Sequence, residues 1–99
     1  MTTTGHLEAV IHGRVQGVGF RYFVARAADR LGLVGWVANE PGGRVHCVAE
    51  GPVERLESLL DELRAGPPGA YVERVDASWD SPIEAFRQFE VRTGWHPGD

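Results

Sequence analysis

Two segments with the apolar spacing of a helix constrain the fold of this 99-residue chain more than any other feature. Between Phe20 and Leu31, and again between Val53 and Leu63, apolar residues recur at the spacing that lines one stripe of a helix. Gly32 follows the first segment, Pro52 stands at a favoured first position of the second, and Gly66 follows it. The sequence therefore predicts one helix over about Phe20–Leu31 and a second that ends before Gly66.

Strand-forming segments precede, separate and follow these helices, and Leu7, Ala9 and Ile11 share one face of the first of them. The predicted strands are Leu7–Val15, Leu33–Asn39, Arg44–Glu50, Tyr71–Trp79 and Gln88–Arg92. The turn-forming cluster Glu40-Pro41-Gly42-Gly43 predicts a hairpin. The order β-α-β-β-α-β, with a short extra C-terminal strand, is typical of a ferredoxin-like α+β sandwich, in which a mainly antiparallel sheet carries two helices on one face.

No repeat or low-complexity tract divides the chain, so we expect one domain over residues 1–99, with a core of about 6–93 and mobile ends. The only cysteine, Cys47, alternates with Val45 and Ala49 on one strand face, which predicts a buried structural thiol. A lone thiol suits a reducing compartment, and neither a secretory signal nor an apolar run of ~20 residues is present. We therefore expect a cytoplasmic protein with no membrane partner.

Charge and residue usage exclude several functions. A net charge of -4 disfavours binding to nucleic acid, which normally requires an excess of basic residues. All ten basic residues are arginine, so lysine Schiff bases and the lysine-dependent phosphate loop of ATPases have no candidate residue. The aromatic side chains Trp36, Trp79, Phe20 and Phe23 are interpreted as packing residues, with Trp36 at the border of a site.

A glycine-rich connection leads from the first predicted strand into the first predicted helix, and it reads Gly13-Arg14-Val15-Gln16-Gly17-Val18-Gly19-Phe20-Arg21. Glycines can turn successive backbone N–H groups inward, and the helix dipole adds positive charge to such an anion cradle. Arg21 stands in the first helical turn beside it. A plain glycine-rich turn followed by a surface arginine is the alternative interpretation.

Histidines offer little for a metal ion. His12 and His46 are expected on neighbouring strands and could form a pair, but two ligands do not make a site. His6 and His96 are expected in the mobile ends. We therefore expect no metal and no cofactor.

The glycine-rich segment resembles the phosphate-binding signature of the acylphosphatases. Gly32-Leu33-Val34-Gly35-Trp36-Val37-Ala38-Asn39 resembles the second signature of that family. The resemblance continues through Gly43-Arg44-Val45 and Val48-Ala49-Glu50-Gly51 to Phe89-Glu90-Val91-Arg92, so it covers nearly the whole chain.

The resemblance implies hydrolysis of the carboxyl-phosphate anhydride of small acyl phosphates to a carboxylate and inorganic phosphate, without a metal or a covalent intermediate. It assigns catalysis to Arg21, which binds the phosphoryl group, and to Asn39, which positions the attacking water. The implied phosphate-binding residues are Gln16, Gly17, Val18, Gly19, Phe20 and Arg21. Glu40 adds a negative charge next to Asn39. Inorganic phosphate is then product and inhibitor, and we expect a monomer.

Two alternatives share these signatures. One is a noncatalytic module of the same fold that senses an anion. The other is the carbamoyl-phosphate-handling domain of a larger maturation protein. The presence of both Arg21 and Asn39 favours the enzyme over the sensor.

Overall fold

The computed structural model describes residues 3–93, and within them it confirms the predicted order of elements. The elements are β1 (Thr4–Arg14), α1 (Phe20–Arg30), β2 (Val34–Asn39), β3 (Val45–Pro52), α2 (Val53–Ala65), β4 (Tyr71–Asp80) and β5 (Phe89–Arg92). β1 begins earlier than predicted because Thr4 still pairs with Pro52, which ends β3 and immediately precedes α2. The tail that we expect to be mobile lies, from residue 94 onward, outside the described residues.

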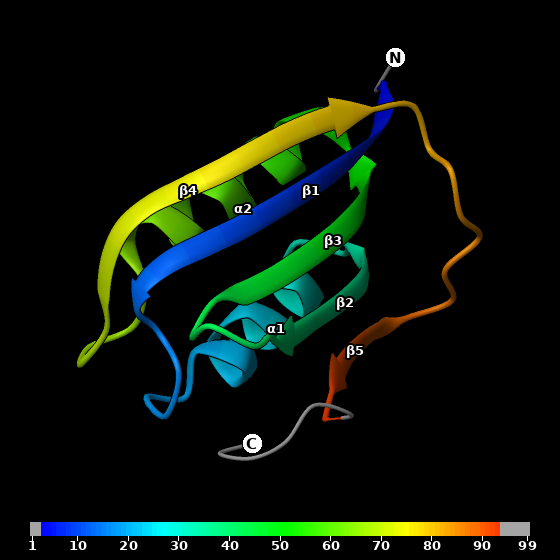
Figure 1. Cartoon of the computed structure of the whole chain (residues 1–99). Coiled ribbons are helices and arrows are strands. Elements are labelled where there is room, and N and C mark those ends of the chain that lie inside the picture. Colours follow the sequence, from blue (N-terminus) through cyan, green and yellow to red (C-terminus); the bar gives the residue numbers. More distant parts are fainter. Residues whose placement is uncertain (1–2, 94–99) are drawn as a thin grey trace.

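The strands form one sheet in the order β4-β1-β3-β2-β5 (Figure 1). Neighbouring strands are antiparallel except β2 and β5, which are parallel. Ile11 of β1 pairs with Val45 of β3, and Val45 pairs with Asn39 of β2. The segment that follows β1 and the β2–β3 hairpin therefore emerge at the same end of the sheet.

Both helices cover one face of this sheet, behind the strands in the view of Figure 1. Leu7, Ala9 and Ile11 point into this layer and are fully buried, as their alternation predicts. Cys47 is buried there too, as predicted, and burial raises the pKa of its thiol to about 12. Neither helix is long and apolar enough to cross a membrane.

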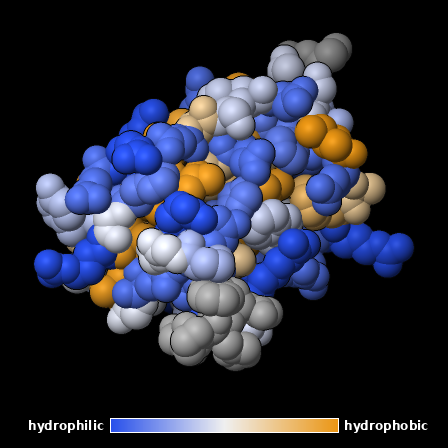
Figure 2. Space-filling model, viewed as in Figure 1, coloured by the Kyte–Doolittle hydropathy of each residue, from blue (hydrophilic) through white to orange (hydrophobic). Residues whose placement is uncertain are grey.

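The opposite face of the sheet has no helix over it in the described part of the chain and is mostly hydrophilic (Figure 2). Trp36 lies on this open face, where its ring makes an edge contact with His46 at 4.9 Å between centroids. The guanidinium of Arg92 stacks over the same ring at 4.4 Å from its centroid. A polar face of this kind is the normal solvent side of an antiparallel sheet.

One ion pair is buried at the end of the sheet where β1 begins. His6 Nδ1 lies 2.6 Å from Glu50 Oε2, with 9% and 6% of the two side chains exposed. The same oxygen accepts hydrogen bonds from the backbone N–H groups of Ile83 and Glu84 at 2.8 and 3.2 Å. The expectation that His6 lies in a mobile end is wrong, because this carboxylate fixes it and also ties the β4–β5 connection to the sheet.

The pKa of Glu50 reflects these contacts. Burial alone raises it, but the hydrogen bond from His6, the two backbone N–H groups and the positive charge on His6 together lower it below its ordinary value. The unfolded chain therefore binds more protons than the folded chain in acid. The stabilising effect of Glu50 is complete above its ordinary pKa and is lost as pH falls through the lowered one.

Replacing Glu50 with glutamine tests this effect. We expect the free energy of unfolding of the parental protein to fall more steeply between about pH 5 and about pH 2 than that of Glu50→Gln, which has no carboxyl group to titrate. Urea unfolding followed by tryptophan fluorescence across this range measures both curves. Parallel curves would show that Glu50 has the same pKa in the folded and unfolded states.

Candidate active site

The segment after β1 forms a concave loop that ends at the first turn of α1. Gly17 and Gly19 both have φ of 76°, a left-handed conformation that glycine adopts without strain. A Cβ built on either would meet nothing within 4 Å, so open space lies beside both. Glycine is needed here for its backbone angle, and the loop leaves room for a small ligand.

The N-terminus of α1 begins without a side-chain cap. Gly19 is the N-cap residue, its carbonyl accepts the first helical hydrogen bond from the N–H of Phe23 at 3.0 Å, and no side chain caps the turn. The N–H groups before Phe23 thus have no intrahelical partner. No acidic residue stands in this turn, so the positive end of the helix dipole is not neutralised locally.

The N-terminus of α2 provides a direct contrast. Glu54 places a carboxylate in the first turn of α2, and the N–H of Val53 donates to the carbonyl of Thr3 at 2.8 Å. Its positive end is therefore already compensated. Of the two helices, α1 is the one whose N-terminus is suited to bind an anion.

A cavity of about 220 Å³ opens at this N-terminus. It is lined by Val15, Gly17, Gly19, Phe20, Arg21, Tyr22 and Asn39, so none of its described lining residues is acidic. Arg21 from α1 and Asn39 from the end of β2 therefore line the same cavity. Asn39 is only 5% exposed, which makes it a buried amide at the wall of an electropositive cavity.

Some of the predicted site residues do not line this cavity. Val18 packs against the core, and the side chain of Gln16 is directed to the β2–β3 hairpin. Trp36 is on the open face instead, since strand alternation directs it away from Asn39. Tyr22, which the sequence analysis did not single out, does line the cavity and is 55% exposed. The sequence signal that could have identified Tyr22 is its place directly after Arg21, as an aromatic residue in the first turn of the helix.

Backbone and aromatic contacts hold the Arg21 side chain. Its Nη1 donates to the carbonyl oxygen of Arg92 in β5 at 3.1 Å. The centre of its guanidinium lies 6.0 Å from the centroid of the Tyr22 ring. The C-terminal strand therefore contributes to the placement of the cationic group of the cavity.

The carboxylate of Glu40 is engaged by basic groups. Its Oε2 lies 2.5 Å from His46 Nδ1, and its Oε1 lies 3.7 Å from Arg44 Nε. Glu40 does not line the cavity, and these contacts hold its carboxylate outside it. The negative charge next to Asn39 in the sequence thus lies outside the cavity.

The histidines pair with carboxylates rather than with each other. His12 Nε2 lies 2.9 Å from Asp76 Oδ2, and His46 Nε2 lies 2.7 Å from Glu8 Oε2. Between residues 3 and 93, no group of three or more His, Cys, Asp and Glu side chains is arranged to hold a metal ion. His96 lies outside the described residues.

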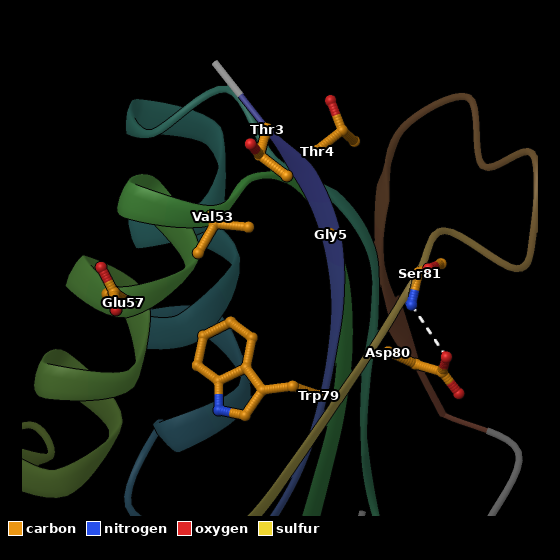
Figure 3. Close-up of a pocket in the computed structure, with 8 residues that line it drawn as sticks. All are labelled: Thr3, Thr4, Gly5, Val53, Glu57, Trp79, Asp80 and Ser81. Carbon is orange, nitrogen blue, oxygen red and sulfur yellow. Dashed lines mark hydrogen bonds between the residues drawn. The ribbon is translucent and has the colours of Figure 1, made fainter. Parts of the chain in front are cut away.

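A larger cavity, of about 620 Å³, lies at the opposite end of the sheet (Figure 3). Its lining residues are Thr3, Thr4, Gly5, Val53, Glu57, Trp79, Asp80 and Ser81. The indole of Trp79 lies beside α2, and none of these residues is basic. Gly5 and Val15 are ten positions apart along β1 and the residue after it, roughly 30 Å of extended chain. This cavity has no group that would attract an anion, so size alone does not identify the site.

Comparison with known proteins gives a consistent result. A family model described as Acylphosphatase matches residues 7–91. An acylphosphatase of Salinibacter ruber is 50% identical over 90 residues, which are 91% of this chain and 95% of that protein. The crystal structure of the acylphosphatase from Bacillus subtilis matches with a TM-score of 0.87 and 37% identity, over 90% of this chain and 99% of that one. Full-length HypF in its phosphate- and nucleotide-bound form matches with a TM-score of 0.84 and 26% identity, over 94% of this chain and 12% of that one.

Two glycine variants test whether the cradle binds an anion. Gly19 and Gly69 have φ of 76° and 91°, and a Cβ on either would meet nothing within 4 Å. Alanine in this region of φ should therefore cost about 1 kcal/mol of folding free energy at both positions. Because Gly69 lies in the turn before β4, only Gly19→Ala should displace the N–H groups of the α1 N-terminus. We expect it to weaken binding of inorganic phosphate by about tenfold or more, measured by calorimetry.

Gly69→Ala is the matched control and should bind phosphate as the parental protein does. Equal phosphate affinity in both variants would mean that the anion is not held by the first turn of α1.

Proposed function

The chain belongs to the acylphosphatase family, whose known activity is hydrolysis of acyl phosphates, and from this premise we propose that Arg21 binds the phosphoryl group and Asn39 positions the attacking water. One observation carries the proposal. Arg21 and Asn39 line the same cavity at the uncompensated N-terminus of α1. A cation, a set of backbone donors and a neutral amide in one space fit a phosphoryl group and a water molecule.

The phosphoryl oxygens would lie against the backbone N–H groups of the cradle and the guanidinium of Arg21. A guanidinium donates two parallel hydrogen bonds to such a group, and the helix dipole adds to the field. Among the residues proposed from the sequence, Gly17, Gly19, Phe20 and Arg21 line the cavity. Gln16 and Val18 can take part only through their backbone.

Asn39 would align the water for attack on phosphorus. Its amide can accept from a water and donate to it, but it is a poor base. The new P–O bond forms as the bond from phosphorus to the acyl oxygen breaks, and the carboxylate leaves with that electron pair. The water proton passes to a phosphoryl oxygen. Because the phosphoryl transition state is loose and the carboxylate leaves readily, positioning and electrostatic stabilisation suffice.

Inorganic phosphate should compete with substrate for the same cradle, since it presents the same oxygens. We also propose that the protein acts as a monomer in the cytoplasm. The fully buried Cys47 thiol and the hydrophilic open face of the sheet support this proposal. The acyl group would be weakly specified, because the cavity contacts centre on the phosphoryl end.

Arg21 variants test the binding role. The parental protein should hydrolyse a chromogenic aryl acyl phosphate with phosphate as a competitive inhibitor. Arg21→Ala should lower kcat/KM by about 100-fold or more and weaken phosphate inhibition in parallel, because a charged donor to the phosphoryl group is removed. Arg21→Lys should remain poor, since an ammonium cannot make paired planar hydrogen bonds.

Arg26→Ala, an exposed position on the same helix, is the control and should leave both values unchanged. Normal phosphate inhibition in Arg21→Ala would show that Arg21 does not bind the phosphoryl group. A parental protein that binds phosphate but does not hydrolyse acyl phosphates would be an anion sensor.

Asn39 variants separate catalysis from binding. Asn39→Ala should reduce turnover by about 100-fold, the scale seen for one preorganised polar group, while phosphate affinity changes less than about twofold. Asn39→Asp should not restore turnover, because its charge repels the anionic substrate. Steady-state hydrolysis and phosphate titration on the same preparation measure both effects.

Thermal unfolding checks that each Asn39 variant is folded, since the side chain is buried. A folded Asn39→Ala protein with parental turnover would show that another group positions the water.

A further inference from the structure

The side chain of Gln16 bridges two parts of the active site. Its Nε2 donates to the carbonyl oxygen of Glu40 and to that of Arg44, each at 2.8 Å. A primary amide has two N–H hydrogens, so this arrangement uses both. Gln16 belongs to the cradle, and the two carbonyls belong to the β2–β3 hairpin directly after Asn39.

We propose that Gln16 is a positioning residue, which sets the distance between the phosphoryl cradle and Asn39 by holding the β2–β3 hairpin. This inference rests on the proposed role of Asn39. It gives the Gln16 side chain a task distinct from binding phosphate, and it explains why a polar amide occurs in a segment of glycine and valine.

The hairpin needs such a tie because its turn is made of permissive residues. Gly42 and Gly43 have φ of 91° and 86°, and two hydrogen bonds close the turn. These run from the N–H of Glu40 to the carbonyl of Arg44 at 2.9 Å, and from the N–H of Gly43 to the carbonyl of Glu40 at 3.3 Å. The two carbonyls that close the turn are the ones that Gln16 reaches, so it adds a second hydrogen bond to each. The turn is thereby fixed against the cradle as well as within itself.

The Asn39 amide depends on this backbone for its position. Among residues 3–93, no side-chain hydrogen bond to the Asn39 amide is found. In the same part of the chain, the segment 15–19 is joined to the hairpin by two side-chain hydrogen bonds, both donated by Gln16. The location of the amide over the cavity therefore follows the end of β2. A small drift of the hairpin would move Asn39 relative to a phosphoryl group held at α1.

Gln16→Met tests the proposal with a side chain of similar length and no donors. Misplacement of a reacting group by about 1 Å can cost up to about 100-fold in rate, so we expect kcat to fall by about 10- to 100-fold. Inhibition by inorganic phosphate should change less than about twofold, because the backbone cradle and Arg21 remain. Gln88→Met is the matched control, since the Gln88 side chain makes only an exposed 3.4 Å hydrogen bond with Glu90. It should leave kcat and phosphate inhibition as they are.

A double-mutant cycle with Asn39→Ala shows whether Gln16 acts through Asn39. If it does, Gln16→Met should lower kcat by less than about twofold in the Asn39→Ala background, since no amide remains to be positioned. The positioning role would be overturned if the losses of kcat caused by Gln16→Met and by Asn39→Ala multiply in the double variant. It would also be overturned by parental kcat in a folded Gln16→Met protein, or by a loss of phosphate affinity as large as the loss of kcat. Asn39→Ala alone is measured in the same series. If it keeps parental turnover, the proposed function of Asn39 fails, and the positioning role of Gln16 falls with it.

Gln16→Asn provides a second route if Gln16→Met does not fold. It keeps the amide but is one methylene too short to reach both carbonyls, so the same loss of kcat with retained phosphate inhibition is expected. Parental kcat in a folded Gln16→Asn protein would contradict the proposal.

Discussion

The pairing of β1 with β3 at the centre of the sheet is the interaction on which the site depends. Ile11 pairs with Val45, which also pairs with Asn39, so the end of β1 is held beside the end of β2. The cradle continues from β1, and the hairpin continues from β2. The cradle and the Asn39 amide thus line one cavity because of strand register, and the Gln16 side chain links the cradle to the hairpin.

The local sequence pattern predicted both helices, all five strands and the buried face of β1, because each of these depends on the spacing of apolar and turn-forming residues that are close in the chain. The two signatures singled out Arg21 and Asn39, which line one cavity in the structure. The contact between His6 and Glu50 could not be predicted in this way, since it joins residues 44 positions apart on adjacent strands. The same holds for the Gln16 side chain, because a glutamine in a glycine-rich loop does not indicate which carbonyls it will reach.

The two faces of the sheet separate two electrostatic environments. The helix face carries the cavity, with Arg21 and the positive end of α1. The open face carries histidine–carboxylate pairs, among them the contact of His46 with Glu8 and Glu40. An acidic protein can therefore keep an electropositive cavity, because Glu40, which follows Asn39 in the sequence, is bound to His46 on the other face of the sheet.

The strand order has a consequence for how the chain acquires its structure. Leu7 in β1 pairs with Ala49 in β3 and with Trp79 in β4, so β1 has no partner close to it in sequence. Closing such long loops costs entropy before any ladder forms, and chains dominated by non-local pairing fold slowly for their size. The cradle at the end of β1 is thus among the first segments to be synthesised, whereas both strands that pair with β1 follow it in the chain.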